Sequence, residues 1–311
     1  MDFTDVAIIG GAPGLTAANT VARQLHTAVV YDNGEYRNKG AKQFHMILTW
    51  DHKDPAEYRA EARKNIEANY STVQFASSVE VAKIEKKSDS HFEVHDSSGT
   101  VTKFRKVILA VGSSNVFPSI PGYQELWGRR IFHCLFCHGY EDRGGASSGI
   151  LAVGPVGGAL AAHMALNAAQ LTEKVTLYTN GDDAVTADVT AATASLLPSK
   201  FSVEPRQIYQ LRRGNEDTDS VTVAFADGTI KTEKFLVHNP ATVAQGPFTT
   251  EAGDIRADYP FWQTSVPGVY AVGDCSTPYK VTPSSITSGC NAAVAVCAEL
   301  QAAKYTKPST G

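Results

Sequence analysis

Two cysteines lie three positions apart, at Cys134 and Cys137, in the segment "FHCLFCHGYED", and a histidine flanks each of them. Thiols at this spacing can hold a metal, form a structural disulfide or exchange electrons. A zinc site needs about four ligands, and the two cysteines with one histidine supply three at most, with no second CxxC in the sequence. A disulfide across so short a loop constrains the unfolded chain little. We therefore predict redox chemistry and no metal site.

The residues around the pair indicate how its reactivity is tuned. We interpret the CxxC as the start of a helix, where the helix dipole favours a thiolate. His138 follows the second cysteine, and an imidazole of unperturbed pKa near ~6.5 can take and return a thiol proton around neutrality. His133 can do the same, and each histidine can instead be a packing or solvent-facing residue. Glu141 either orients the imidazole or is an early-helix acid that favours the dipole.

Three further cysteines stand singly, at Cys275, Cys290 and Cys297. Cys297 falls in an apolar stretch that predicts a helix. All three are predicted to be small buried hydrophobic residues, and no chemistry is assigned to them.

The elements that position these groups begin with a strand at residues 5–11, a glycine turn, a helix at 15–25 and a strand at 26–34. This βαβ pattern places a pyrophosphate at a helix N-terminus. Gly11 and Gly14 keep the G-x-x-G spacing of a dinucleotide fingerprint, although Ile9 stands where the first glycine is expected. Asp32, which ends the second strand, can accept hydrogen bonds from an adenosine ribose. A nucleotide is predicted here.

The pattern of strand, glycine turn and helix occurs again about 140 residues later. Strands are predicted at 72–77, 91–97 and 102–113, then a second strand, glycine turn and helix at 149–171 and a strand at 174–181. Residues 265–300 read as a strand, a polar turn and an apolar helix. Gly273 and Asp274 end that strand and bring a carboxylate close to a ligand, unless Asp274 is a helix N-cap. The fold class is therefore α/β with two Rossmann-like nucleotide-binding domains, which suggests a dinucleotide-dependent oxidoreductase.

Composition narrows the partners and the location. The chain of 311 residues holds 28 Lys and Arg against 32 Asp and Glu without long runs of either, which argues against nucleic acid or an anionic membrane as partner. No apolar run approaches the ~18 residues of a membrane span, and the N-terminal residues have no basic region. Five cysteines suit a reducing compartment. A soluble, unexported, cytoplasmic protein is expected.

Taken in order, "DVAIIGG…GLTAA", Asp32, "VILAVGS", "FHCLFCHGYE" and "VPGVYAVGDC" resemble the low-molecular-weight thioredoxin reductase-like flavoproteins over essentially the whole chain. The chain is most similar to the fungal gliotoxin oxidase type, dithiol oxidases that close disulfides in epipolythiodioxopiperazine natural products. "CLFCHGYE" is the most specific match. The resemblance implies a homodimer of three-layer ββα domains, with an FAD-binding domain at 1–114 and 243–311 and an NADPH-binding-like domain at 115–242 that carries the CxxC.

The resemblance also implies the cofactor and the residues that hold it. It implies FAD, and a redox-active disulfide between Cys134 and Cys137. The implied FAD-binding residues are Gly10, Gly11, Ala12, Pro13, Gly14, Asp32, Asn33, Arg37, Asn38, His45, Ala110, Gly112, Gly273, Asp274, Lys280, Val281 and Thr282.

The second glycine turn departs from the pattern of NADPH-using relatives. Its glycines, at 154, 157 and 158, do not keep the G-x-G-x-x-G spacing. NADPH-dependent thioredoxin reductases place arginines after the next strand to grip the 2′-phosphate. Here the first arginine after Arg143 is Arg206, and Asp182 and Asp183 would repel a phosphate. NADPH is therefore not expected to be the physiological electron donor.

The predicted reaction follows from this departure and from the resemblance. A substrate dithiol, deprotonated with help from His138, attacks Cys134, and Cys137 passes the electron pair to FAD and on to O2, which yields H2O2. The alternative is an NADPH-dependent thioredoxin or disulfide reductase. A third reading is a non-catalytic nucleotide-binding or redox-sensing protein, against which the intact CxxC argues.

Overall fold

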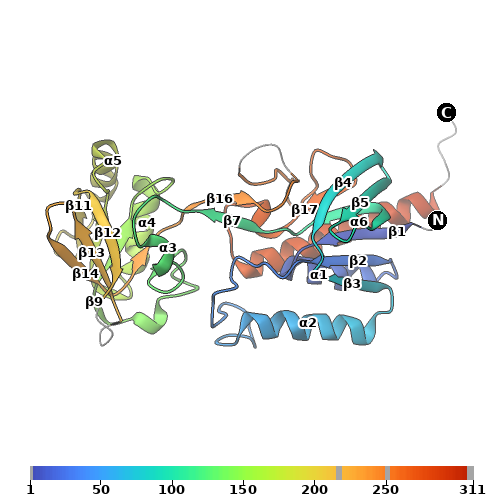
Figure 1. Ribbon diagram of the computed structural model, residues 1–311, viewed down its shortest axis with the longest axis horizontal. Coiled ribbons are helices and arrows are strands. Elements are labelled where there is room, and N and C mark those ends of the chain that lie inside the picture. Colours follow the sequence, from blue (N-terminus) through green and yellow to red (C-terminus); the bar gives the residue numbers. More distant parts are fainter. Residues whose placement is uncertain (1–2, 215–218, 249–252, 307–311) are drawn as a thin grey trace. The chain divides into compact units, whose positions relative to one another are not determined.

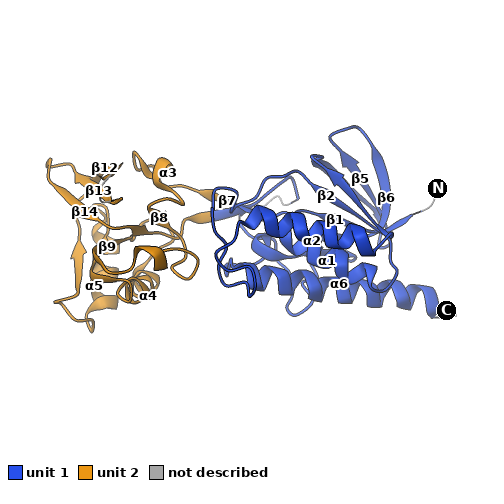
Figure 2. Cartoon of the chain, turned by 90° about the horizontal axis from the view of Figure 1, so that it is seen from below, with its two compact units in different colours: residues 1–114, 242–311 blue, residues 115–241 orange. Residues whose placement is uncertain are grey.

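The chain forms two compact units, Met1–Ser114 with Thr242–Gly311, and Asn115–Ala241 (Figure 2). The computed structural model describes residues 3–214, 219–248 and 253–306. Strand β7 (Ser113–Val116) leads out of the first unit and β16 (Ala241–Ala244) leads back, and the two strands pair as a two-stranded sheet. None of the described helices is long and apolar enough to cross a membrane.

The first unit is built on a seven-stranded sheet with the order β3-β2-β1-β6-β5-β4, and β17 also pairs with β6 (Figure 1). Strand β6 joins two layers, because its first half pairs antiparallel with β5 and its second half pairs parallel with β1 and β17. The strands are β1 (Thr4–Ile9), β2 (Ala28–Asp32), β3 (Val73–Ser77), β4 (Val81–Ser88), β5 (His91–Asp96), β6 (Val101–Leu109) and β17 (Val269–Ala271). The parallel strands end at one edge, where the glycine turns follow.

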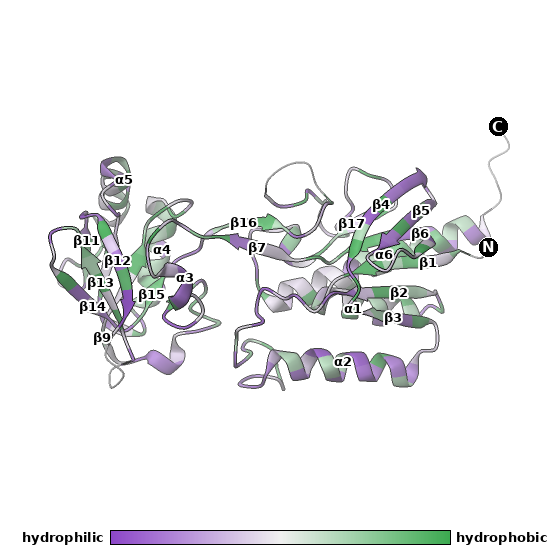
Figure 3. Cartoon of the chain, viewed as in Figure 1, coloured by the Kyte–Doolittle hydropathy of each residue, from purple (hydrophilic) through white to green (hydrophobic). Residues whose placement is uncertain are grey.

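Three helices complete this unit: α1 (Ala12–Ala22), α2 (Pro55–Asn69) and α6 (Thr282–Tyr305). α1 and α6 lie side by side (Figure 1). Gly289 makes this approach possible, since a Cβ there would lie 2.2 Å from the Pro13 carbonyl oxygen. α2 begins at the N-cap Asp54, which accepts a hydrogen bond from the backbone of Ala56. Hydrophilic positions recur along α2 (Figure 3), as expected for a helix with one solvent-facing side.

The second unit has a five-stranded parallel sheet with the order β11-β10-β9-β15-β8 and a separate antiparallel sheet β12-β13-β14. Its strands are β8 (Ile131–Phe132), β9 (Gly145–Leu151), β10 (Thr172–Tyr178), β11 (Phe201–Glu204), β12 (Ile208–Arg213), β13 (Val221–Phe225), β14 (Ile230–Glu233) and β15 (Leu236–Val237). Its helices are α3 (Tyr123–Leu126), α4 (Gly158–Ala168), α5 (Asp183–Thr193) and the 3-10 helix η1 (Tyr140–Asp142).

The parallel sheet of this unit is buried on both faces. Ile150 and Leu177 pack with α4 and α5, whereas their neighbours Leu151 and Tyr178 pack with β12 and β13. Since successive side chains of a strand point to opposite faces, each strand contributes to two cores. This three-layer arrangement confirms the predicted α/β class.

Candidate active site

The two cysteines of the CxxC form a disulfide just after β8. The backbone N–H groups of Cys137 and His138 both donate to the Cys134 carbonyl, at 3.2 and 3.0 Å, which makes a single turn. The predicted helix start is wrong, because no helix begins at these residues. Gly139, at φ +103°, ends the turn, and only the three-residue η1 follows. A helix dipole therefore does not tune these cysteines, and the side chains around them must.

Both predicted histidines lie in one aromatic group with this turn. The His138 ring stacks on Phe132 with centroids 5.3 Å apart, and the His133 ring stacks on Trp127 at 6.0 Å. The two imidazole centroids are 6.2 Å apart. Stacking limits the rotation of each ring, so each imidazole is presented in a defined orientation.

Ion pairs link the residues that precede the CxxC to those that follow it. Arg130, which precedes β8, donates to the Asp142 carboxylate in η1 at 2.8 Å and also contacts Asp219. Lys234 lies 3.5 Å from the same Asp142 carboxylate. Glu141, the predicted positioning residue, lies within η1 beside Asp142. Arg130 and Asp142 were not predicted as site residues, although two opposite charges that bracket a CxxC are a signal in the sequence.

In the first unit, the glycine turn joins the ends of three strands. The Gly10 N–H donates to the Tyr31 carbonyl at 2.8 Å, and the Ala110 N–H donates to the Ile9 carbonyl at 2.7 Å. Gly10 is at φ +115°, and a Cβ there would lie 2.0 Å from the Ala110 carbonyl oxygen. α1 starts directly after the turn, with neither a side-chain cap nor an acidic residue in its first turn. Its free N–H groups suit a pyrophosphate.

Asp32 lies beside this turn with both carboxylate oxygens engaged. Oδ1 accepts a hydrogen bond from the Gly34 N–H at 3.0 Å, and Oδ2 accepts one from the Tyr36 hydroxyl at 2.6 Å. Burial, together with the Asp32 charge, raises the pKa of Tyr36, so its hydroxyl stays protonated and donates. The Tyr36 ring also borders Gly11, where a Cβ would lie 2.8 Å from it. Tyr36 was not predicted as a site residue.

Asp274 connects the C-terminal segment to the N-terminal one. Its Oδ2 lies 3.5 Å from Nη1 of Arg37, and its Oδ1 accepts from the Ser285 hydroxyl at 3.3 Å. Burial lowers the pKa of Arg37, and the Asp274 charge opposes that shift. Lys280 donates to the Asp274 carbonyl at 2.6 Å and to Asp254 at 2.8 Å. The Asp274 carboxylate is therefore engaged by Arg37 and Ser285, and Asp274 is not the N-cap of α6, which is Val281.

The other predicted FAD residues are placed as follows. Ala12, Pro13 and Gly14 open α1; Gly273 is at φ +73° against Pro13; Gly112 is at φ +72°; Val281 and Thr282 open α6; Asn33 accepts from Glu35; Asn38 accepts from Arg59; and His45 faces Asp51. Ala12, Pro13, Gly14 and Gly273 lie at the glycine turn. The geometry fits a dinucleotide, because glycine cradles and an open helix N-terminus meet at one sheet edge.

The corresponding turn in the second unit is occupied by the chain itself. The Gly158 N–H, at the start of α4, donates to Oδ2 of Asp188 at 2.6 Å. A Cβ on Gly158 would lie 2.8 Å from Oδ1 of the same carboxylate. Asp188 belongs to α5, thirty residues further along the chain. A carboxylate therefore lies at the N-terminus of α4, the end of a helix that attracts anions.

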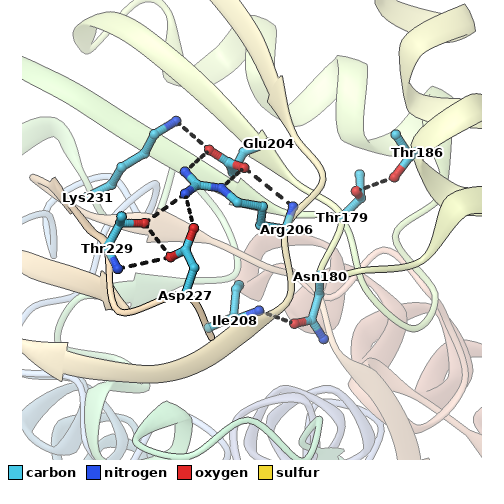
Figure 4. Close-up of polar contacts among 9 residues, drawn as sticks. All are labelled: Thr179, Asn180, Thr186, Glu204, Arg206, Ile208, Asp227, Thr229 and Lys231. Carbon is cyan, nitrogen blue, oxygen red and sulfur yellow. Dashed lines mark hydrogen bonds and ion pairs between the residues drawn. The ribbon is translucent and has the colours of Figure 1, made fainter. Parts of the chain in front are cut away.

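The cations near the end of β11 are paired with acids (Figure 4). Arg206 donates to Glu204 at 2.8 Å and to Asp227 at 2.9 Å, and Lys231 lies 2.9 Å from Glu204. Hydrogen bonds from Arg206 lower the pKa of Glu204 to about 2, so this acid stays charged. Asn180, in the segment after β10 where arginines were looked for, accepts from the Ile208 N–H at 2.8 Å.

The three single cysteines do not belong to the disulfide site. Cys275 and Cys297 are buried, as predicted, while Cys290 is only half-buried. Burial raises the pKa of Cys275 to about 12 and that of Cys297 to about 11, which makes both poor thiolates at neutral pH.

Comparison with known proteins identifies the family. The family described as pyridine nucleotide-disulphide oxidoreductase matches residues 4–294. The chain belongs to this family. Its FAD-binding flavoprotein chemistry agrees with the glycine turn of the first unit and with the disulfide of the second. The protein is thus a flavin-dependent thiol/disulfide oxidoreductase whose cofactor is FAD.

Individual members of the pyridine nucleotide-disulphide oxidoreductase family extend the likeness. "Thioredoxin reductase aclD" of Aspergillus oryzae is 39% identical over 307 residues, 95% of this chain and 96% of the relative. "Thioredoxin reductase tcpT" of Claviceps purpurea is 38% identical over 297 residues, 93% of this chain and 91% of the relative. An oxidoreductase of Agrobacterium tumefaciens has a similar crystal structure, with a TM-score of 0.84 at 29% identity, covering 98% of this chain and 100% of that one. These relatives confirm the predicted thioredoxin reductase-like resemblance.

Proposed function

We propose that this disulfide oxidoreductase is a dithiol oxidase, which closes an intramolecular disulfide in a small dithiol natural product of the epipolythiodioxopiperazine class and reduces O2 to H2O2. The observation that carries the proposal is the contrast between the two glycine turns. The N-terminus of α1 is open, whereas that of α4 holds the Asp188 carboxylate at 2.6 Å. A carboxylate in that position repels the phosphates of a nicotinamide nucleotide. The electrons then enter from a substrate dithiol.

The residues of the chain carry out the thiol exchange. A substrate thiolate attacks Sγ of Cys134, the Cys134–Cys137 bond breaks, and Cys137 leaves as a thiolate. The second substrate thiol attacks the substrate sulfur of this mixed disulfide, so the product leaves with a new disulfide and Cys134 is released. His138 takes the protons of the substrate thiols, with His133 as the second candidate base. Bound FAD supplies a two-electron acceptor for the resulting enzyme dithiol and a route to O2, which takes up two protons.

A small apolar substrate also suits the surface at the disulfide. Phe136, between the two cysteines, is 68% exposed, while its neighbour Leu135 packs into the core of the unit. An exposed aromatic ring beside the reacting sulfurs offers stacking and apolar contact to a ring-shaped ligand.

We also propose, from the family resemblance, that the enzyme acts in the cytoplasm as a homodimer. Sedimentation equilibrium would test the homodimer, and microscopy of a tagged chain would test the location.

The second candidate is an NADPH-dependent thioredoxin or disulfide reductase. Fungal relatives at 38 and 39% identity carry the name thioredoxin reductase, which favours it. The paired Arg206 and the aspartates at the second turn argue against it.

Anaerobic stopped-flow mixing separates the two functions. We expect a small dithiol alone to bleach the flavin, and NADPH to bleach it slowly if at all. In air, the dithiol should consume O2 and release H2O2 without any nicotinamide. Millisecond bleaching by micromolar NADPH would contradict the oxidase and favour the reductase.

A cysteine variant tests the thiol chemistry itself. Incubated with the disulfide product, Cys137→Ser should trap it as a mixed disulfide, because the free Cys134 thiolate attacks the product disulfide and no second enzyme thiol displaces it. The adduct is visible as an added mass that dithiothreitol removes. Cys134→Ser should form no such adduct and should retain FAD. An adduct on the Cys134→Ser protein would reverse the roles of the two cysteines.

A further inference from the structure

A closed loop at residues 44–53 precedes α2. Its neck is an antiparallel pair in which the Phe44 N–H donates to the Lys53 carbonyl at 2.7 Å and the His52 N–H donates to the Phe44 carbonyl at 2.8 Å. The rings of Phe44 and Trp50 lie 5.3 and 5.5 Å from that of Tyr58 on α2. The neck is thus fixed by both hydrogen bonds and aromatic packing. The neck therefore brings together the residues that follow Phe44 and those that precede Lys53.

Three potential metal ligands adjoin this neck. Nδ1 of His45 lies 3.3 Å from Oδ1 of Asp51, and Nε2 of His52 lies 3.3 Å from Oδ2 of the same carboxylate. All three ligand atoms lie within 4.8 Å of one another. Around a tetrahedral zinc ion with bonds of about 2.0–2.1 Å, ligand atoms are separated by about 3.3 Å. Each imidazole lies at that distance from a different oxygen of Asp51, and the three ligand atoms lie within 4.8 Å of one another, so side-chain rotation must bring the set around one ion.

The His52 side chain is 55% exposed, and its backbone is at φ +61°, a left-handed conformation that the loop also imposes on Met46 (+65°) and Thr49 (+70°). The Met46 N–H donates to Oδ1 of Asp51 at 3.2 Å and orients this carboxylate as an outer-shell donor does in metal sites.

We propose that His45, Asp51 and His52 bind one divalent transition-metal ion, with Zn²⁺ preferred and water completing the coordination. Two imidazoles and one carboxylate suit Zn²⁺ and other borderline metals, whereas Mg²⁺ and Ca²⁺ prefer all-oxygen sites. The proposal stands apart from the proposed function, because it involves neither the disulfide nor the electron route. It assigns His45 to metal, where the family resemblance implied a contact with FAD.

A second cluster of similar spacing, Glu85, Glu93 and His95, serves as a control. Lys87 lies between Glu85 and Glu93, and Lys83 contacts Glu85 as well. Ammonium groups thus already occupy the carboxylates of this cluster, so a metal ion would have to displace them. We expect no metal there.

The test is zinc binding by the oxidised, FAD-loaded enzyme, in which the Cys134–Cys137 disulfide cannot act as a thiolate ligand. Equilibrium dialysis with elemental analysis should find one Zn²⁺ per chain. Asp51→Asn and His52→Gly should each weaken binding at least roughly tenfold, and His95→Gln should leave it unchanged. His52→Gly is a fair test, because glycine suits the backbone at that position.

Two further readouts keep the outcome clear. Zn²⁺ should raise the Tm of the wild-type and His95→Gln enzymes and leave that of His52→Gly unchanged, since a ligand stabilises only the state that binds it. Flavin absorbance should stay the same in all variants. Absence of stoichiometric zinc, or zinc retained by His52→Gly, overturns the proposal. Loss of FAD from His52→Gly, with zinc binding kept, overturns it as well and returns the loop to the flavin site.

Discussion

At the scale of single residues, the disulfide and its histidines are presented by contacts that the motif does not contain. Phe132 and Trp127 stack on the two imidazoles, and the Arg130–Asp142 ion pair closes the segment. Because no helix starts at the CxxC, the histidines are the groups left to move protons.

His138 should therefore be the main proton acceptor of the thiol exchange. We expect His138→Ala to lower turnover at neutral pH by about 10²- to 10⁴-fold, because a positioned general base contributes that much. Raising the pH should restore part of the rate, since the substrate thiol then ionises unaided. The matched variant His133→Ala should have a smaller effect on the pH–rate profile. An unaltered profile in His138→Ala would move the role to His133.

His238 makes the stability of the second unit depend on pH. A carbonyl can only accept, so Nε2 carries the hydrogen in its contact with Val153 O at 3.2 Å, and Nδ1 accepts from the Tyr123 hydroxyl at 2.6 Å. Burial lowers the pKa of His238 to about 4. The unfolded chain, with a pKa near ~6.5, binds the extra proton between these values. The stabilisation is complete above pH ~6.5 and is lost as the pH falls toward 4.

Urea unfolding measured between pH 7.5 and 4.5 tests this. The free energy of unfolding of the wild-type protein should fall by up to about 1.4 kcal/mol per pH unit through this group in that window. His238→Gln should lose that contribution to the slope, whatever its absolute stability. Equal slopes in the two proteins would contradict a neutral buried His238.

At the scale of elements, two similar strand-turn-helix units differ at the helix N-terminus. α1 leaves its first N–H groups open, and α4 is capped from α5. Asp188→Ala should therefore lower the free energy of unfolding by about 0.5–2 kcal/mol, as for the loss of an N-cap. Inorganic pyrophosphate should raise the Tm of this variant more than that of the wild type. The exposed Asp183→Ala is the control, and an equal response in both variants would refute the role of Asp188.

The first glycine turn depends on the absence of a side chain at Gly10. Gly10→Ala adds a Cβ 2.0 Å from the Ala110 carbonyl oxygen, so the strand ends must separate and FAD should be lost. Gly99 has a similar φ of +85° with open space around it, and Gly99→Ala should cost only the ~1–2 kcal/mol of backbone strain. Flavin content after purification and urea unfolding measure both effects. Full flavin content in Gly10→Ala would contradict the turn geometry.

At the scale of the whole molecule, each unit has its own cores, so we expect two unfolding transitions. Only the first unit carries the FAD turn. Excess FAD at 100 times its Kd should stabilise that unit by about 2.7 kcal/mol and leave the other transition in place. Far-UV circular dichroism and flavin fluorescence, followed together in urea, would show this. A single transition that shifts as a whole with FAD would contradict independent units.

Features that depend on local spacing could be predicted from the sequence. The glycine turn at Gly10, the acid at Asp32, the CxxC and the Gly273–Asp274 pair were all visible, because each lies within a few residues of a strand end. The α/β class followed from the alternation of strands and helices, since periodicity is a local property. The family resemblance supplied FAD and the thiol chemistry.

Contacts between distant segments became known only from the folded chain. Asp188 reaches α4 from thirty residues away, and Arg37 meets Asp274 across 237 residues. The sequence also misled at the CxxC, where Gly139, at φ +103°, ends the turn before a helix can form. Such outcomes depend on which helices and loops pack together, and short-range propensity carries no information about a partner that the fold brings in from elsewhere in the chain.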